Sequence, residues 1–189
     1  MPLVSATDKD KVFEQLCARF DGVKSLRIHF KALNQRFSGV LTFARPDKFR
    51  VEFYSDNKIQ RIIVSNGKSL WNYVPEEGRV VVSTPENSER VDLQNLFADL
   101  CKHFNAYSLA KEINSQLGSN LVLHLRLKED SAQNVKIYLD SKLQIKAIAF
   151  SNGRESAIYQ IKKINLNVKT TSSTFDFSPP KDTEVIDLR

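Results

Sequence analysis

The sequence contains few of the residues from which catalytic and metal sites are usually built. It has six glycines, three histidines and two cysteines among 189 residues. It contains no Gly-x-Ser-x-Gly elbow and no glycine-rich phosphate loop. His29, His103 and His124 fall in separate predicted elements, and none has the spacing of a metal ligand set. We therefore expect a protein that is not an enzyme and that holds no metal and no cofactor.

The chain also lacks any apolar run close to the roughly 20 residues that a membrane helix needs. Hydrophobic residues make up 41% of the sequence and charged residues 26%, which is typical of a globular domain. The length predicts a single domain that covers residues 1–189. The net charge of +6 favours anionic partners. However, the basic residues alternate with the aromatic ones along the predicted strands, so we expect no nucleic acid partner.

The residues give little information about the cellular compartment. Cys17 and Cys101 match no metal spacing, and two separate buried thiols are the favoured interpretation. The alternative is a long-range disulfide, which requires an oxidising compartment. Residues 1–6 are too short and not basic enough for a signal peptide, so the residues alone leave open a cytoplasmic protein or a mature secreted domain.

Hydrophobic periodicity predicts amphipathic helices at 8–20 and 92–104 and strands in most of the remaining chain. Short turns such as Asn66-Gly67 and Arg45-Pro46 make consecutive strands antiparallel. A short strand is expected from Thr174, before a proline-stiffened tail. The other predicted strands cover 25–33, 36–44, 48–55, 59–65, 68–74, 78–83, 121–127, 134–140, 144–150 and 155–168.

An antiparallel sheet of this length has an apolar face that must be covered. With only two or three helices, we expect a mainly β fold of about eleven strands, in which the sheet curls and helices cover its open side. Pairing across Asn66-Gly67 predicts that Ile62 lies near Trp71 on one face. Whether the apolar side is a filled core or the wall of a ligand cavity stays open. Its predicted residues are Leu41, Phe43, Phe49, Val51, Phe53, Ile62, Trp71, Tyr73, Leu123, Leu125 and Ile137.

Five segments, in order along the chain, resemble the LolA-type periplasmic lipoprotein carriers. The combination of Gly-x-Leu-x-x-x-Arg-Pro, Ser-x-Gly-Lys-x-Leu-Trp-x-Tyr and a terminal Phe-x-Phe-x-Pro-Pro makes this resemblance specific. Together the segments cover nearly the whole chain. They read VKSLRIHF, FSGVLTFARPDKFRVEF, IIVSNGKSLWNYVPEEGRV, ESAIYQI and FDFSPPKDTEVID.

The resemblance implies an incomplete β-barrel, closed on its open side by helices, around a hydrophobic cavity. Such carriers are periplasmic chaperones for protein transport. They accept the acyl chains of lipoproteins from an inner-membrane ABC transporter and pass them to an outer-membrane acceptor, so they serve outer membrane biogenesis. We expect this chain to act in the same way, as a monomer without catalysis.

The resemblance also implies roles for individual residues. Arg45 matches the arginine that bonds to helix backbone and holds the lid closed, and Phe49 matches an aromatic residue near the cavity mouth. The predicted helix at 92–104 is the candidate lid, with Leu93, Leu96, Phe97 and Leu100 on its apolar side. The chain departs from the family pattern at Val51, often tryptophan, at Thr42, which matches an aromatic position, and in its two cysteines.

Other functions on the same half-barrel remain as alternatives. These are an outer-membrane receptor, a carrier of lipid or glycolipid, and a regulator that senses a signalling lipid. A receptor is expected to have a lipidated cysteine directly after its signal peptide. A regulator usually has an additional domain or a membrane anchor.

Overall fold

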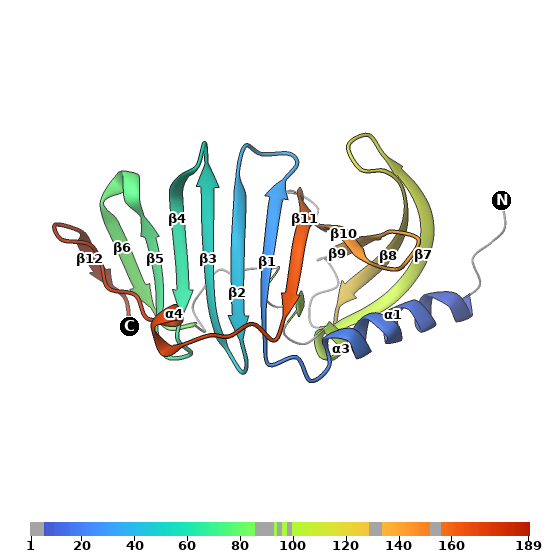
Figure 1. The fold of residues 1–189 in the computed structure, drawn as a ribbon, viewed down its shortest axis with the longest axis horizontal. Helices are drawn as coiled ribbons and strands as arrows, with labels where there is room; N and C mark the ends of the chain where they lie inside the picture. Colours follow the sequence, from blue (N-terminus) through green and yellow to red (C-terminus); the bar gives the residue numbers. More distant parts are fainter. Residues whose placement is uncertain (1–5, 86–92, 94–95, 98–99, 129–133, 152–155) are drawn as a thin grey trace. The chain divides into compact units, whose positions relative to one another are not determined.

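The structure is a computed structural model, which describes residues 6–85, 93, 96–97, 100–128, 134–151 and 156–189. Its helices are α1 (Ala6–Phe20), α3 (Leu100–His103), α4 (Ser172–Phe175) and the 3-10 turn η1 (Pro75–Glu77) (Figure 1). In the described part of the chain, no helix is long and apolar enough to cross a membrane. The strands are β1 (Ser25–Ala32), β2 (Ser38–Ala44), β3 (Lys48–Ser55), β4 (Lys58–Ser65), β5 (Leu70–Val74), β6 (Arg79–Ser83), β7 (Phe104–Asn114), β8 (Gly118–Leu127), β9 (Asn134–Leu139), β10 (Ile145–Ser151), β11 (Ser156–Leu166) and β12 (Glu184–Asp187).

The strands pair in the order β12-β6-β5-β4-β3-β2-β1-β11-β10-β9-β8-β7. Strands β12 and β7 end this order, so the sheet of the described residues is not closed by pairing. These observations confirm the predicted mainly β fold with an open, largely antiparallel sheet. Two details differ at the C-terminus. The segment expected to form a strand begins in helix α4, and the last strand, β12, follows the prolines and runs parallel to β6.

The chain divides into two compact units, which are described separately below. Unit 1 comprises residues 1–22, 31–35 and 95–162, and unit 2 comprises residues 23–30, 36–94 and 163–189. Strands β1 and β11 each contribute residues to both units. The single domain predicted from the length stays a prediction.

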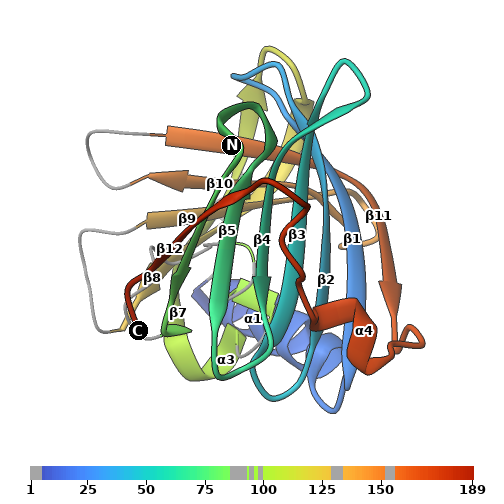
Figure 2. The same cartoon turned by 90° about the vertical axis from the view of Figure 1, so that its left-hand side faces the viewer.

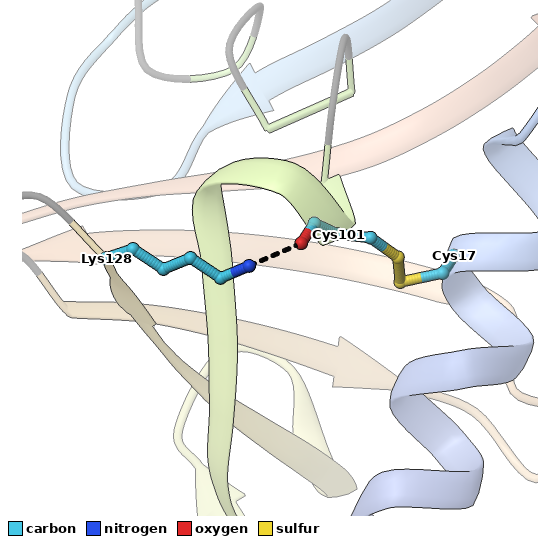
Figure 3. Close-up of a disulfide and its surroundings, with 3 residues drawn as sticks. All are labelled: Cys17, Cys101 and Lys128. Atoms are coloured by element: carbon cyan, nitrogen blue, oxygen red, sulfur yellow. Dashed lines mark hydrogen bonds between the residues drawn. A yellow bond between two sulfur atoms is a disulfide. The ribbon is translucent and has the colours of Figure 1, made fainter.

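Helix α1 in unit 1 packs against strands β7 and β8 and against α3. A disulfide joins Cys17 of α1 to Cys101 of α3, and Lys128 Nζ donates a hydrogen bond of 2.8 Å to the Cys101 carbonyl (Figure 3). The favoured interpretation of two separate buried thiols is therefore wrong. The two cysteines lie 84 positions apart in the sequence, and only the packing of α1 against α3 brings them together.

Strand β7 does not follow from the sequence pattern. Its pairing with β8 shifts register between Ala106 and Ser108, so Tyr107 interrupts the alternation that would mark a strand. The strand begins at Phe104, where the predicted helix 92–104 was expected to end. Within that range Leu93, Leu96, Phe97 and Leu100–His103 are helical, and the remaining positions before Phe104 lie outside the described residues.

Candidate functional site

One apolar face of unit 2 is built from the first three strands, and we call it the Phe49 face. Leu41 lies opposite Val51, and Phe43 lies opposite Phe49, so all four side chains project to the same side of the sheet. Each is at most 4% exposed. Strand β1 alternates in the same way and buries Leu26, Ile28 and Phe30. Five of the predicted cavity residues therefore lie on one continuous apolar surface. They are Leu41, Phe43, Phe49, Val51 and Phe53.

Aromatic rings form one end of the Phe49 face. Phe53 contacts Phe30 and Phe37 edge to face, with ring centroids 6.1 and 5.5 Å apart. Gly39 lies opposite Phe53, and a Cβ at this position would lie 2.3 Å from the Phe30 ring. The glycine of the Gly-x-Leu-x-x-x-Arg-Pro motif therefore leaves space for the Phe30 ring, which is the close approach for which glycine is suited.

The prediction that Ile62, Trp71 and Tyr73 share this face is wrong. Ile62 pairs with Tyr73 across the hairpin, and Trp71 is two residues from Tyr73, so the three do lie on one face. However, Ile62 also pairs with Glu52, which projects to the side opposite Val51. These three residues therefore lie on the other side of the sheet, which we call the Glu52 face.

The chain near the C-terminus lies on the Glu52 face. Phe177 packs against Tyr73 with ring centroids 5.5 Å apart. Helix α4 lies against the sheet and contacts β3 (Figure 2). Ile62, Ile63 and Val64 are all buried, so β4 buries side chains on both faces, whereas the buried Val80 and Val82 of β6 project to one side of the sheet. The sequence signal for β4 is the uninterrupted apolar run at 62–64, because a strand covered on both sides does not alternate.

Arg45 lies in an exposed turn at the end of β2. Its Nε donates a hydrogen bond of 2.8 Å to the Val23 carbonyl, and its backbone N–H donates one of 2.9 Å to the Lys24 carbonyl. Val23 and Lys24 lie between helix α1 and strand β1. The arginine therefore anchors the Arg-Pro turn to the chain that follows α1, through two backbone carbonyls.

The remaining predicted cavity residues form an apolar face in unit 1. Leu123 of β8 lies opposite Ile137 of β9, and Leu125 lies opposite Val135. Leu123, Leu125 and Ile137 are fully buried. The opposite side of the same strands has its own small core, in which Val122, Tyr138 and Ala147 are buried together.

The four apolar residues predicted for the candidate lid are buried, and an aromatic contact and a disulfide connect its later part to helix α1. Leu93, Leu96, Phe97 and Leu100 are all at most 5% exposed. Phe97 packs edge to face on Phe20 of α1, with centroids 5.1 Å apart. The disulfide at Cys101 adds a covalent connection just beyond Leu100. We call Leu96, Phe97 and Leu100–His103 the lid segment. The lid segment and helix α1 are thus tied together within unit 1.

Charged side chains on strands β7 to β9 form an ion-pair cluster around Glu112. The Glu112 carboxylate lies 2.5 Å from His124 Nε2 and accepts a hydrogen bond of 2.8 Å from Lys136 Nζ. Next to it, Tyr107 contacts the His124 ring and is covered by the Arg126 guanidinium, 4.5 Å from the ring centroid. Within the described ranges, no group of three His, Cys, Asp or Glu residues is placed to hold a metal ion.

The cluster makes stability depend on pH. Burial acts to raise the pKa of Glu112, but the hydrogen bonds and charges of Lys136 and His124 outweigh it, so the pKa lies below its ordinary value of 4.5. A lowered carboxylate pKa stabilises the fold above pH 4.5, and this stabilisation is lost as the pH falls through the folded-state value.

We expect Glu112→Gln to lower the unfolding free energy at pH 7 by about 1 kcal/mol, because a partly buried ion pair is lost. The difference from the unsubstituted protein should shrink steadily below pH 4.5. Urea unfolding measured across this pH range checks both points. Glu77→Gln is the control, since its ion pair with Arg79 is about half exposed. An equal effect of both substitutions at every pH would contradict the assignment.

Comparison with known proteins identifies the family. Residues 23–178 match the family described as outer membrane lipoprotein carrier protein LolA. The chain is 24% identical over 195 residues to the outer-membrane lipoprotein carrier protein of Azotobacter vinelandii, covering 97% of this chain and 92% of that protein. It is 28% identical over 152 residues to the protein of the same name from Methylibium petroleiphilum, covering 79% and 72%.

A solved structure supports the same fold. An uncharacterized conserved protein from Thermus thermophilus superimposes with a TM-score of 0.58 at 14% identity, covering 94% of this chain and 98% of that one. At this identity the similarity concerns the fold alone. The family match covers most of the chain, including β1 to β11, α4 and the Phe49 face. The chain therefore belongs to the LolA family of outer membrane lipoprotein carrier proteins.

Proposed function

We propose that the protein is a periplasmic carrier that binds the acyl chains of lipoproteins on its apolar sheet faces and transports them from the inner to the outer membrane. The observation that carries this proposal is the family match over residues 23–178. The relatives that cover most of the chain are named outer-membrane lipoprotein carrier proteins. In this role the chain is a non-enzymatic chaperone, works as a monomer and needs no cofactor.

The Phe49 face offers the chemistry that such a ligand needs. Its aliphatic and aromatic side chains have no hydrogen-bonding groups, and an acyl chain gains about 0.8 kcal/mol for each methylene that leaves water. Leu123, Leu125 and Ile137 in unit 1 supply a second surface of the same kind. We propose that an inner-membrane ABC transporter loads the carrier and that an outer-membrane acceptor unloads it.

The Cys17–Cys101 disulfide supports a periplasmic location. Disulfides persist in oxidising compartments such as the bacterial periplasm and are rare in the cytosol. Cys101 is exposed and Cys17 is only half-buried, so soluble reductants can reach the bridge. A stable bridge at this position therefore fits an oxidising environment.

We propose that Arg45 and the lid segment hold the unloaded carrier closed. Arg45 binds the carbonyl of Val23, and the lid segment is tied to α1 by the disulfide and the Phe20–Phe97 contact. Loading must then break some of these contacts. The affinity for acyl chains is consequently moderate, which suits a carrier that also has to release its ligand.

Displacement of an environment-sensitive apolar dye by a triacylated lipopeptide tests this function. We expect displacement at low micromolar lipopeptide. Arg45→Leu should tighten lipopeptide binding about fivefold, because the closed state loses one charge-assisted hydrogen bond. Arg36→Leu is the matched control, since Arg36 is exposed in the turn between β1 and β2. If the dye neither binds nor is displaced, the apolar faces are filled cores and the protein is not an acyl-chain carrier.

A further inference from the structure

A polar pocket lies on the Glu52 face of unit 2, on the side of the sheet opposite the Phe49 face. Its volume is about 460 Å³, which is within the range of small-molecule sites. Strands β1, β2 and β3 form its floor, and α4 contributes two hydroxyl groups. The residues that line it are Arg27, His29, Val40, Thr42, Arg50, Glu52, Ser173 and Thr174.

The pocket has an excess of positive charge. It contains two guanidinium groups, Arg27 and Arg50, and one carboxylate, Glu52. Glu52 accepts hydrogen bonds from Arg50 Nε at 2.7 Å and from the Tyr54 hydroxyl at 2.5 Å. Burial acts to raise the pKa of Glu52, but these hydrogen bonds and the charges of Arg50 and Arg27 hold it below 4.5. Glu52 is thus ionised at neutral pH, and one of the two positive charges has no matching carboxylate.

Arg27 is the cation that is left available. Among the described residues, its guanidinium makes one hydrogen bond, from Nε to Thr42 Oγ1 at 3.2 Å, and has no carboxylate oxygen within 4.0 Å. No buried side-chain nitrogen in the described part of the chain lacks a partner, so the two terminal nitrogens of Arg27 remain accessible. They provide the planar pair of donors that binds two oxygens of a phosphate group.

Hydroxyl groups of α4 lie beside the guanidinium groups. The Thr171 N–H donates to Thr174 Oγ1 at 3.2 Å, and Thr171 Oγ1 lies 2.8 Å from Ser173 Oγ. These bonds fix the positions of both pocket hydroxyls. A hydroxyl can donate to an anion as well as accept. Val40 is the single aliphatic residue in the lining, so the pocket is poorly suited to an acyl chain.

We propose that this pocket binds a phosphate group, either of a small soluble phosphate ester or of a phospholipid headgroup. Arg27 supplies the bidentate contact, Arg50 adds positive charge, and Ser173 and Thr174 donate to the remaining oxygens. The pocket and the Phe49 face lie on opposite sides of the same three strands, so phosphate binding does not depend on the proposed carriage of acyl chains.

Titration calorimetry with the full chain tests the pocket with inorganic phosphate and with glycerol 3-phosphate. Cosedimentation with phosphatidylcholine vesicles, with or without phosphatidylglycerol, tests the lipid source. Arg27→Gln should weaken binding about tenfold or more, since one charge-assisted contact is lost. Glu52→Gln should strengthen it several-fold, because the competing carboxylate is removed. Lys146→Gln makes the same charge change as Arg27→Gln at an exposed site in unit 1 and should have no effect.

Opposite effects of Arg27→Gln and Glu52→Gln support the proposal, because a general loss of folding cannot strengthen binding. If these opposite effects are seen with soluble phosphates alone, the ligand is a free phosphate ester. If they are seen with phosphatidylglycerol vesicles alone, the ligand is a lipid headgroup. Absence of binding to all of these probes at millimolar concentration overturns the proposal, and so does binding that Arg27→Gln leaves unchanged.

Discussion

Replacement of both cysteines in a Cys17→Ser/Cys101→Ser variant should lower the unfolding free energy by about 4 kcal/mol. The bridge connects residues 84 positions apart, and a cross-link over so long a loop removes much of the conformational freedom of the unfolded chain. For a protein of this size, the loss corresponds to a decrease in Tm of about 10 °C. Thermal unfolding of the variant and of the unsubstituted protein, both without reductant, measures it.

Reductant provides the control for this experiment. The unsubstituted protein with a thiol reductant should unfold like the double variant, and the variant itself should not respond to reductant. Thiol titration of the denatured, unreduced protein should find no free cysteine. Two free thiols, or equal Tm values in all samples, would show that the bridge does not form. The lid segment would then be joined to α1 by packing alone.

The second large effect is expected at Leu41, which distinguishes the two faces of unit 2. Leu41→Ala and Ile62→Ala each remove a buried aliphatic side chain, and each should cost about 3 kcal/mol of stability. Of these two residues, Leu41 lies on the Phe49 face and Ile62 does not, since Ile62 pairs with Glu52 on the other side of the sheet. Leu41→Ala should therefore weaken binding of a triacylated lipopeptide about tenfold through lost apolar contact.

Ile62→Ala is the matched control and should change the lipopeptide affinity by less than about twofold. Urea unfolding measures the stability of both variants, and dye displacement measures their affinity below the onset of unfolding. Equal losses of affinity in the two variants would mean that lipopeptide binding depends on the global stability of the protein and not on which face of the sheet carries the substitution. A loss confined to Ile62→Ala would place the acyl-chain surface on the Glu52 face, beneath the C-terminal segment.

The elements themselves follow closely from local patterns. The helix predicted at 8–20 matches α1, and the strands predicted between residues 25 and 83 match β1 to β6 within a few residues. Helical spacing and strict alternation are properties of a short stretch, so they can be read before any packing is known. Strand β7 was not predicted in this way, because its bulge near Tyr107 breaks the alternation of apolar and polar residues.

The candidate site depends on which residues pair across neighbouring strands, and no single stretch of the sequence contains this information. In β4 the run Ile62-Ile63-Val64 offers an apolar side chain to either face. The pairing of Ile62 with Glu52 decides that Ile62 joins Trp71 and Tyr73 away from the Phe49 face. A shift of one residue would reverse this assignment, because successive side chains point to opposite sides.

By itself, then, the sequence determined the mainly β architecture, the antiparallel order of the first strands and the apolar surface of β2 and β3, since each of these depends on neighbouring residues. Tertiary structure alone decided the disulfide, the parallel pairing of β12 with β6 and the pocket around Arg27. In each of these cases groups more than 80 positions apart meet, as Cys17 meets Cys101, Arg79 meets Glu184 and Arg27 meets Ser173. Such contacts depend on how whole elements pack, and local periodicity carries no information about that packing.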